Sequence, residues 1–221
     1  VIPINIMRNI KYLFLNNNNL VDIKEIGSYI NLEVLDLECN NINELTNLPP
    51  MLSELNCGHN NLKALPELKN LTMLDCSDNM LENLNVYEKI RTLSCSNNNI
   101  RFIPALKNLK KLICENNMIT CISNFPCLEY LNCGFNKIES IKDCPNIIDI
   151  LCRNNKLIYL QDNFPYLKYL EIYCNKLDTL HYFPNLKELY CDVDGISQLS
   201  KRYIVDKFKV YSNNKCFVLF K

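Results

Sequence analysis

Apolar residues recur in this chain with a period of 19 to 22 residues along nearly its whole length. Within each period the pattern is L-x-x-L-x-(L/C)-x-x-N-x-(L/I)-x-x-(L/I), as in LEVLDLECNNINEL, LEYLNCGFNKIESI and IIDILCRNNKLIYL. Positions within a repeat are numbered from its first apolar residue. These first residues are Ile10, Leu32, Leu52, Leu71, Ile90, Leu109, Leu128, Ile147, Leu167, Leu186 and Val205.

The apolar residues at positions 4 and 6 predict a short strand that buries these two side chains and exposes positions 3, 5 and 7. No repeat leaves room for a long helix, and the return segments carry most of the prolines. Because proline fixes φ and removes a donor, we expect extended or short 3₁₀ returns. One repeat cannot bury its own leucines, so stacked repeats should share one core with a parallel sheet along one face.

Asparagine occupies position 9 of nearly every repeat, from Asn18 to Asn213, with Asp194 as the exception. An amide offers two donors and one acceptor, so a stacked row of amides can satisfy the backbone of the turn after each strand. This row explains about a third of the 35 asparagines. We expect most of the others in loops, where asparagine tolerates turn geometry.

The repeat resembles the short kind of leucine-rich repeat over about residues 10–213. The resemblance implies an α/β-type solenoid: a right-handed superhelix with a curved parallel β-sheet on its concave face and mostly extended or 3₁₀ convex returns. It also implies binding of other macromolecules, usually proteins, on the concave face, without catalytic residues or cofactors. The cysteines and the load of Asn, Ile, Lys and Tyr are similar to repeat proteins of large DNA viruses of amoebae and of some low-GC bacteria.

Seven of the 13 cysteines stand at position 6, where other repeats carry leucine or isoleucine. We expect these seven to form a ladder of buried thiols that act as small apolar side chains; they are Cys57, Cys76, Cys95, Cys114, Cys133, Cys152 and Cys191. Parallel side chains in a row neither converge on a metal ion nor present disulfide geometry, so no metal site is expected. Cys144 should also be buried, whereas Cys39 and Cys174, beside the asparagine row, should be partly exposed.

The ends of the chain favour caps over the exposed core layers. The predicted organisation is an N-terminal half-repeat over residues 1–9, ten repeats over 10–204, and a degenerate eleventh repeat with a C-terminal cap over 205–221. A natural chain that extends before Val1, or a signal peptide that has been removed, stays an alternative because the sequence lacks an initial Met.

The outward strand positions differ between the two halves of the chain. Repeats two to four present acidic and small polar residues, including Asp36, Glu38 and Asp75, whereas repeats six to ten are rich in tyrosine and aliphatic residues. Exposed tyrosines with an arginine are typical of interface hot spots, although tyrosine also suits a sheet surface for its β-propensity alone. The predicted partner-binding residues are Ile113, Tyr130, Phe135, Asp149, Leu151, Arg153, Tyr169, Glu171, Tyr173 and Tyr190.

The composition excludes several other functions. With 24 basic and 24 acidic side chains the chain has no net charge to drive binding to nucleic acid, and no apolar run is long enough for a membrane span. Asp36 and Asp75, two strands apart, could approach glycosidase-like spacing, but carboxylates on an open, solvated sheet indicate solubilising charge. The chain is therefore not expected to be an enzyme.

The sequence thus predicts a non-catalytic interaction module, monomeric, that binds a protein partner through its concave face. The alternative is a structural or surface protein in which the solenoid serves as a spacer or self-association surface. An odd number of mostly buried cysteines favours a reducing compartment, so we expect a cytoplasmic protein, in the host cytoplasm if viral, rather than a secreted one.

Overall fold

The computed structural model describes residues 8–160, 164–192, 209–213 and 216–220. The chain divides into two compact units, unit 1 (Val1–Leu109) and unit 2 (Lys110–Lys221). Both are built from the same repeating turn: a three- or four-residue strand, a tight turn and an extended return.

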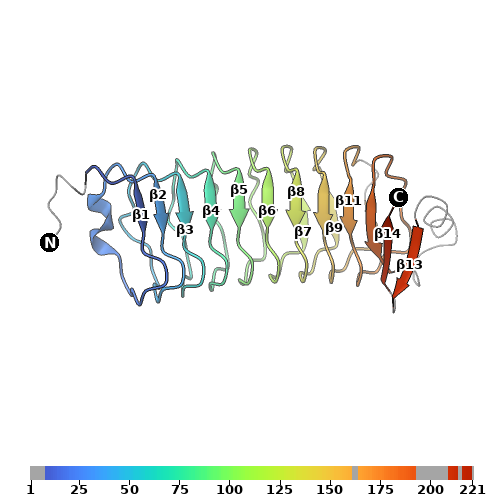
Figure 1. Cartoon of the computed structure of the whole chain (residues 1–221), viewed down its shortest axis with the longest axis horizontal. Helices are drawn as coiled ribbons and strands as arrows, with labels where there is room; N and C mark the ends of the chain where they lie inside the picture. Colours follow the sequence, from blue (N-terminus) through green and yellow to red (C-terminus); the bar gives the residue numbers. More distant parts are fainter. Residues whose placement is uncertain (1–7, 161–163, 193–208, 214–215, 221) are drawn as a thin grey trace. The chain divides into compact units, whose positions relative to one another are not determined.

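Unit 1 contains five parallel strands, each paired with the next along the chain (Figure 1). They are β1 (Tyr12–Phe14), β2 (Val34–Asp36), β3 (Glu54–Asn56), β4 (Met73–Asp75) and β5 (Thr92–Ser94). Each strand covers positions 3 to 5 of its repeat, and position 4 pairs with position 4 throughout, as in Leu35 opposite Leu55. The predicted register is therefore confirmed.

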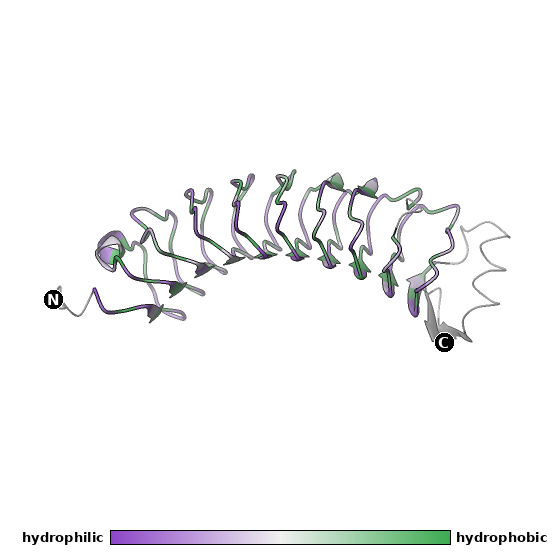
Figure 2. Cartoon of the chain, turned by 90° about the horizontal axis from the view of Figure 1, so that it is seen from above, coloured by the Kyte–Doolittle hydropathy of each residue, from purple (hydrophilic) through white to green (hydrophobic). Residues whose placement is uncertain are grey.

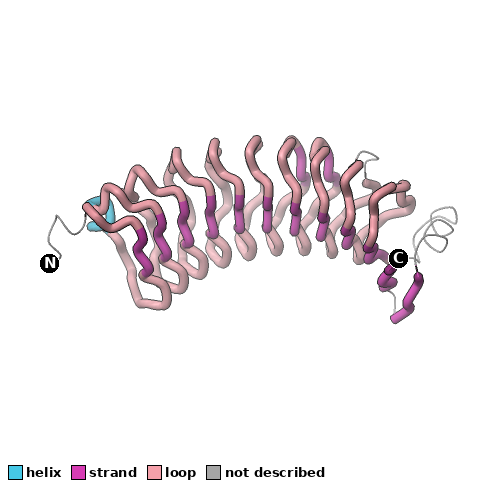
Figure 3. The backbone as a smooth tube through the Cα atoms, turned by 45° about the horizontal axis from the view of Figure 1, so that its top comes forward, coloured by secondary structure: helices cyan, strands magenta, loops and turns pink. Residues whose placement is uncertain are grey.

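The first return of unit 1 contains the helix of the described part of the chain, the 3₁₀ helix η1 (Lys24–Ser28) (Figure 3). Ile26 of this helix is buried. Gly27 lies so close to the return of the next repeat that a Cβ at this position would be 2.6 Å from the carbonyl oxygen of Asn47. Glycine is therefore required where these two returns meet.

Unit 2 continues the pattern with five parallel strands in register. They are β6 (Lys111–Ile113), β8 (Tyr130–Asn132), β10 (Asp149–Leu151), β11 (Tyr169–Glu171) and β12 (Glu188–Cys191). Next to β12, β14 (Cys216–Phe220) pairs antiparallel, and β13 (Lys209–Asn213) pairs antiparallel with β14. Much of the predicted eleventh repeat and of both predicted caps lies outside the described residues, which lack 1–7 and 193–208.

Two returns of unit 2 form a second small sheet that the repeat pattern does not predict. β7 (Cys121–Ser123) and β9 (Ser140–Lys142) pair in parallel, on the side of the unit away from β6 and β8 (Figures 2 and 3). Ile122 and Ile141 of these strands are buried. The extended return was expected, but its pairing depends on the distance to the neighbouring return, which the pattern does not contain.

The centre of the core is formed by the Leu, Ile and Cys side chains at positions 4 and 6, which are at most 2% exposed from the second repeat to the tenth. All seven cysteines of the predicted ladder are buried as free thiols, and so is Cys144. Cys39 is partly exposed and Cys174 is exposed. The interpretation of the seven ladder cysteines and Cys144 as core residues is confirmed, and so is the expected exposure of Cys39 and Cys174.

The asparagine row at position 9 satisfies the turn backbone as predicted. The Asn60 amide nitrogen donates to the carbonyl oxygens of Leu37, Cys57 and Gly58 at 2.9 to 3.2 Å. Its Oδ1 accepts a hydrogen bond of 2.9 Å from the Ile42 backbone N–H in the preceding repeat. Equivalent bonds are made by Asn40, Asn79, Asn98, Asn136, Asn155 and Asn175.

A second row of asparagines precedes the first apolar residue of alternate repeats. Each donates through Nδ2 to a backbone carbonyl 20 to 23 residues earlier in the chain, at 2.7 to 3.0 Å; the donors are Asn31, Asn70, Asn108, Asn146 and Asn185. These residues lie in loops, as expected. They also hold adjacent returns together, which was not predicted.

Candidate functional site

The ten predicted partner-binding residues all lie in unit 2, and we call the surface that they form the tyrosine face. Seven belong to or directly follow the strands β8, β10 and β11, with Ile113 on β6 and Tyr190 on β12 completing its two ends. Phe135 lies in the turn after β8. The parallel register places position 3 residues in one row and position 5 residues in another.

The row at position 3 alternates aromatic and charged side chains. Tyr130, Asp149, Tyr169 and Glu188 stand opposite one another on β8, β10, β11 and β12. Lys111 precedes them on β6 and places its ammonium nitrogen 5.2 Å from the centre of the Tyr130 ring. The Tyr130 ring thus already makes a cation–π contact with Lys111.

The row at position 5 places Leu151, Glu171 and Tyr190 opposite one another on β10, β11 and β12. Ile113 stands opposite Asn132 at the β6 end of this row. Leu151, Ile113 and Tyr190 are half-buried, whereas Glu171 is only 7% exposed. The burial of Glu171 was not predicted, because its neighbours come from three different repeats.

Two tyrosines at the β11 and β12 end pack against each other. The rings of Tyr169 and Tyr190 have centroids 5.3 Å apart and planes tilted by 38°. The Tyr169 hydroxyl donates to Glu171 Oε2 at 3.2 Å, and the Tyr190 hydroxyl donates to Glu188 Oε2 at 3.4 Å. Burial and these carboxylates raise the pKa of both tyrosines, so both hydroxyls stay protonated donors at neutral pH.

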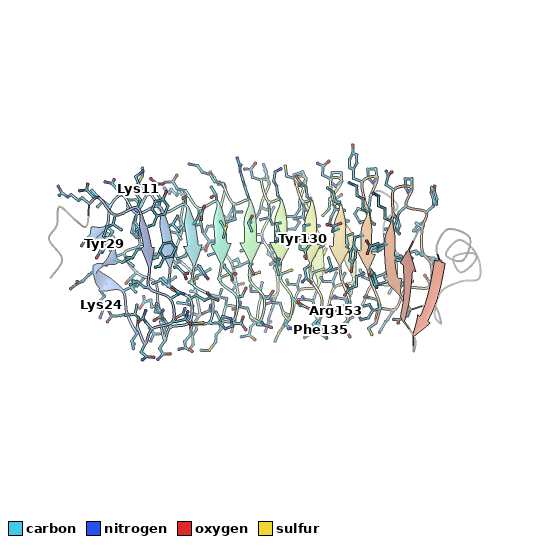
Figure 4. The ribbon with its side chains drawn as sticks, in the orientation of Figure 1. Lys11, Lys24, Tyr29, Tyr130, Phe135 and Arg153 are labelled. Carbon is cyan, nitrogen blue, oxygen red and sulfur yellow. The ribbon has the colours of Figure 1, made fainter. Side chains whose placement is uncertain are left out.

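Arg153 joins three repeats through two ion pairs. Its guanidinium donates at 2.6 Å to Glu115 Oε1 and at 3.0 Å to Glu171 Oε1. The same guanidinium lies 5.3 Å from the centre of the Phe135 ring (Figure 4). Arg153 and Glu171 are thus paired within the face, where they fix its geometry.

The bridge between Arg153 and Glu115 crosses an intervening repeat at Gly134. A Cβ at Gly134 would lie 3.2 Å from both Arg153 Cγ and Glu115 Oε1. The two long side chains therefore pass over a glycine that leaves them room. The sequence shows the glycine at position 7, but not that its two neighbours meet above it.

Asp149 differs from the other carboxylates of the face. Among the described residues, no side chain donates a hydrogen bond to its carboxylate in the way that Arg153 donates to Glu115. Burial raises its pKa, the charge of Lys168 opposes this rise, and the charge of Glu188 adds to it. Asp149 lies in a shallow depression of about 330 Å³, lined by Tyr130, Asp149, Leu151, Lys168, Tyr169, Lys187 and Glu188.

The predicted acidic residues of unit 1 have a structural role. Oδ1 of Asp36 accepts a hydrogen bond of 3.0 Å from the backbone N–H of Glu38, and Asp75 accepts one of 3.0 Å from that of Ser77. Asn56 and Asn132 make the same contact in their repeats. A position 5 Asp or Asn thus closes the turn that ends its strand.

Four strands of unit 2 lack this closing residue. At position 5 they carry Ile113, Leu151, Glu171 and Tyr190 in place of Asp or Asn. All four belong to the tyrosine face. Phe14 of β1 and Ser94 of β5 in unit 1 also lack Asp or Asn at this position, whereas β8, within the face, keeps Asn132.

Two exposed aromatic residues on the sheet of unit 1 were not among the predicted binding residues. Tyr12 is 60% exposed and Phe14 is 64% exposed, both on β1. The sequence does contain a signal for both, because they occupy the outward positions 3 and 5 of the first repeat. The four tyrosines of the tyrosine face are, by contrast, half-buried.

Within the residues that the structure describes, no group of three or more His, Cys, Asp or Glu side chains is placed to hold a metal ion. None of the helices in that part of the chain has the length and apolar character to cross a lipid bilayer.

Models of leucine-rich repeats match three segments of the sequence. The model described as "Leucine Rich repeats (2 copies)" matches residues 88–127 and 107–146, and the model described as "Leucine Rich Repeat" matches residues 31–55. No curated protein matches the sequence significantly.

Solved structures share the fold over most of this chain. A leucine-rich repeat protein of Leptospira interrogans is 27% identical with a TM-score of 0.79, and the match covers 92% of this chain and 60% of that one. The leucine-rich effector protein YopM from Yersinia pestis is 28% identical with a TM-score of 0.73, and the match covers 86% of this chain and 58% of that one.

A third structure, the LRIM1/APL1C complex, shows the fold alone: it is 22% identical with a TM-score of 0.75, over 89% of this chain and 41% of that one. The chain thus spans about 60% or less of the length of these three structures. The repeat pattern, the parallel solenoid strands, the family models and these structures together show that the chain is a leucine-rich repeat protein.

Proposed function

We propose that this chain is a protein-interaction module that binds its partner through the tyrosine face of unit 2. The fold is a common protein-interaction module, and one similar structure is that of a complex. The residues that would bind are the ten that the sequence singles out, from Ile113 to Tyr190.

The observation that carries this proposal is the exchange at position 5. Asp36, Asn56, Asp75 and Asn132 each use this position to close a turn. Ile113, Leu151 and Tyr190 expose apolar or aromatic surface at the same position without making that bond. A side chain that does not close its own turn and keeps apolar surface half-exposed is suited to a binding surface.

Binding alone is the mechanism that these residues support. The tyrosines offer large, rigid contact area with a polar tip. Arg153, clamped between Glu115 and Glu171, holds the strands of the face in one arrangement, so little ordering is left to be done on association. The packed pair of Tyr169 and Tyr190 belongs to the same prearranged surface.

A crosslinking pull-down from cell extract tests the proposal. The parent chain is compared with Tyr169→Ala/Tyr173→Ala and with Asp36→Asn/Asp75→Asn, which keeps the turn-closing oxygen in unit 1 and changes only charge. We expect a partner that the tyrosine variant loses and the unit 1 control retains. Equal recovery by all three proteins contradicts a role for the face.

The same experiment separates the alternative function. If the material crosslinked through the face is the chain itself, the solenoid is a self-association surface and the structural alternative holds. The monomeric state that we propose is measured by light scattering of the purified chain over a hundredfold range of concentration. The proposed cytoplasmic location is tested by fractionation of the source cells.

A further inference from the structure

We propose that the depression of the tyrosine face receives an arginine or lysine side chain of the partner, held between Tyr130 and Tyr169 over the carboxylate of Asp149. The inference rests on the proposed function and names the chemistry of the partner: a segment with a basic residue at the centre of its contact.

The first argument is the arrangement of three neighbouring strands. Asp149 on β10 stands between Tyr130 on β8 and Tyr169 on β11, directly opposite each in the sheet. Strands lie about 4.8 Å apart, so the two tyrosines are separated by roughly 10 Å with the carboxylate between them. An aromatic ring on each side of a carboxylate is suited to a cation, which gains both ring-face and ionic attraction.

The second argument is that Asp149 is open to a partner. The other buried or half-buried acids of this face are engaged: Glu115 and Glu171 by Arg153, and Glu188 by the Tyr190 hydroxyl. Among the described residues, the Asp149 carboxylate receives no such donor. A half-buried carboxylate without a donor loses solvation that a cationic partner group would restore.

The third argument is the charge of the face as a whole. The outward positions 3, 5 and 7 of repeats six to ten carry five carboxylates (Glu115, Asp149, Glu171, Glu188, Asp192) and two cationic side chains (Lys111, Arg153). Burial raises the pKa of Tyr130, and so do the charges of Asp149, Glu115 and Glu171. These outward positions are therefore net negative, and their carboxylates attract a basic segment. The depression itself is lined by two carboxylates, Asp149 and Glu188, and by two lysines, Lys168 and Lys187.

Two lysines compete with this partner group. Lys168 and Lys187 line the depression from the position before each strand, and both residues are exposed. The charge of Lys168 acts on Asp149. Their long stems let both ammonium groups stay in water, so they line the rim, and the carboxylate remains accessible to an incoming guanidinium or ammonium group.

The test uses random twelve-residue peptides displayed on phage and selected on the full chain. We expect the selected peptides to be enriched in Arg or Lys and to lose binding to Tyr130→Ala and to Asp149→Asn. The matched control is Asp36→Asn, a sheet carboxylate of unit 1 already engaged in its own turn. Thermal melting of each variant checks that it is folded.

A selected peptide is then titrated calorimetrically, beside the same peptide with its arginine replaced by citrulline, its neutral isostere. We expect citrulline to weaken binding by about tenfold or more, and Asp149→Asn to remove most of this difference. Lys168→Gln should strengthen binding of the arginine peptide, because it removes the competing cation whose charge acts on Asp149.

The outcomes distinguish this inference from the proposed function. Peptides that need Tyr169 and Leu151 but show no basic residue, or bind equally with citrulline, overturn the inference and leave the interaction function standing. Acidic peptides that Lys168→Gln weakens overturn it as well. Selected peptides that bind every tyrosine-face variant as tightly as the parent overturn both.

Discussion

At the scale of single residues, the backbone conformation of the turn after each strand restricts which residue types suit position 8. Position 8 adopts a left-handed conformation in nine repeats, with φ between 51° and 56°. Five of these residues are Asn or Asp, which tolerate this region through their short polar side chains. The other four are Cys39, His59, Phe135 and Cys174, whose side chains are less favourable in a left-handed conformation.

Cys39→Asn should therefore stabilise unit 1. Asparagine fits the left-handed conformation of residue 39 better than cysteine does, so we expect the free energy of unfolding to rise by about 1 kcal/mol, measured by urea denaturation. Cys39→Ala is the matched control, because alanine is as strained there as cysteine. A gain with alanine equal to that with asparagine would contradict the conformational explanation.

Asn136→Ala should have the opposite effect. Asn136 Oδ1 accepts from the backbone N–H of Ile119 at 2.9 Å, and its Nδ2 donates to the Cys114 carbonyl at 2.9 Å. Loss of these bonds leaves backbone groups unsatisfied, and we expect a cost of about 1–3 kcal/mol, read as a lower thermal midpoint by circular dichroism. The exposed neighbour Lys137→Ala should melt like the parent.

At the scale of the elements, each strand is too short to be stable alone and depends on its neighbours. β8 buries one side chain, Leu131, which is 0% exposed and stands between Leu112 of β6 and Ile150 of β10. The strand therefore contributes to a core that is continuous within unit 2. Its other two side chains, Tyr130 and Asn132, are half-buried on the outward face.

Leu131→Asp should prevent cooperative folding of unit 2, because it places an unpaired charge in the stacked core. Circular dichroism on heating should show no sigmoidal transition for this unit. Asn132→Asp, a charge of the same kind one residue away but on the outward face, should keep the transition. Cooperative melting of Leu131→Asp would show that the repeat register is wrong.

At the scale of the whole molecule, the chain buries thiols where related repeats bury leucine. Burial raises the pKa of Cys57 and Cys95 in unit 1 and of Cys133 in unit 2, and that of Cys144 to about 12. In the unfolded chain these thiols ionise near their ordinary pKa of about 9. The folded chain thus holds protons that the unfolded chain releases.

The contribution of these thiols to stability should therefore be constant from pH 7 to about pH 8 and fall as the pH rises above about 9, because unfolding then releases protons. Each buried thiol adds up to about 1.4 kcal/mol per pH unit to this slope. The measurement is the urea midpoint between pH 7 and pH 10.5. Cys95→Val should reduce the dependence of the free energy of unfolding on pH by the contribution of one thiol. An unchanged pH dependence would show that the core thiols do not cause it.

Most of the solenoid could be predicted from the sequence, because its elements are set by local periodicity. The strands at positions 3 to 5, the buried cysteines and the asparagine row at position 9 all follow from side chains that recur with the repeat. Leu35, Cys57 and Asn60 lie where the pattern predicts. The location of nine of the ten residues of the tyrosine face on outward positions follows in the same way; Phe135 lies in the turn. Their role in binding stays a prediction.

Tertiary structure alone decided the contacts between residues from different repeats. The bridge from Arg153 to Glu115 across Gly134, the burial of Glu171 and the depression around Asp149 depend on side chains that approach one another from neighbouring strands. The pairing of β7 with β9 depends likewise on the spacing of two returns. Sequence periodicity determines which side of a strand a residue occupies. The distances between long side chains on that side are set by packing, and the ion pairs and the depression of this face depend on those distances.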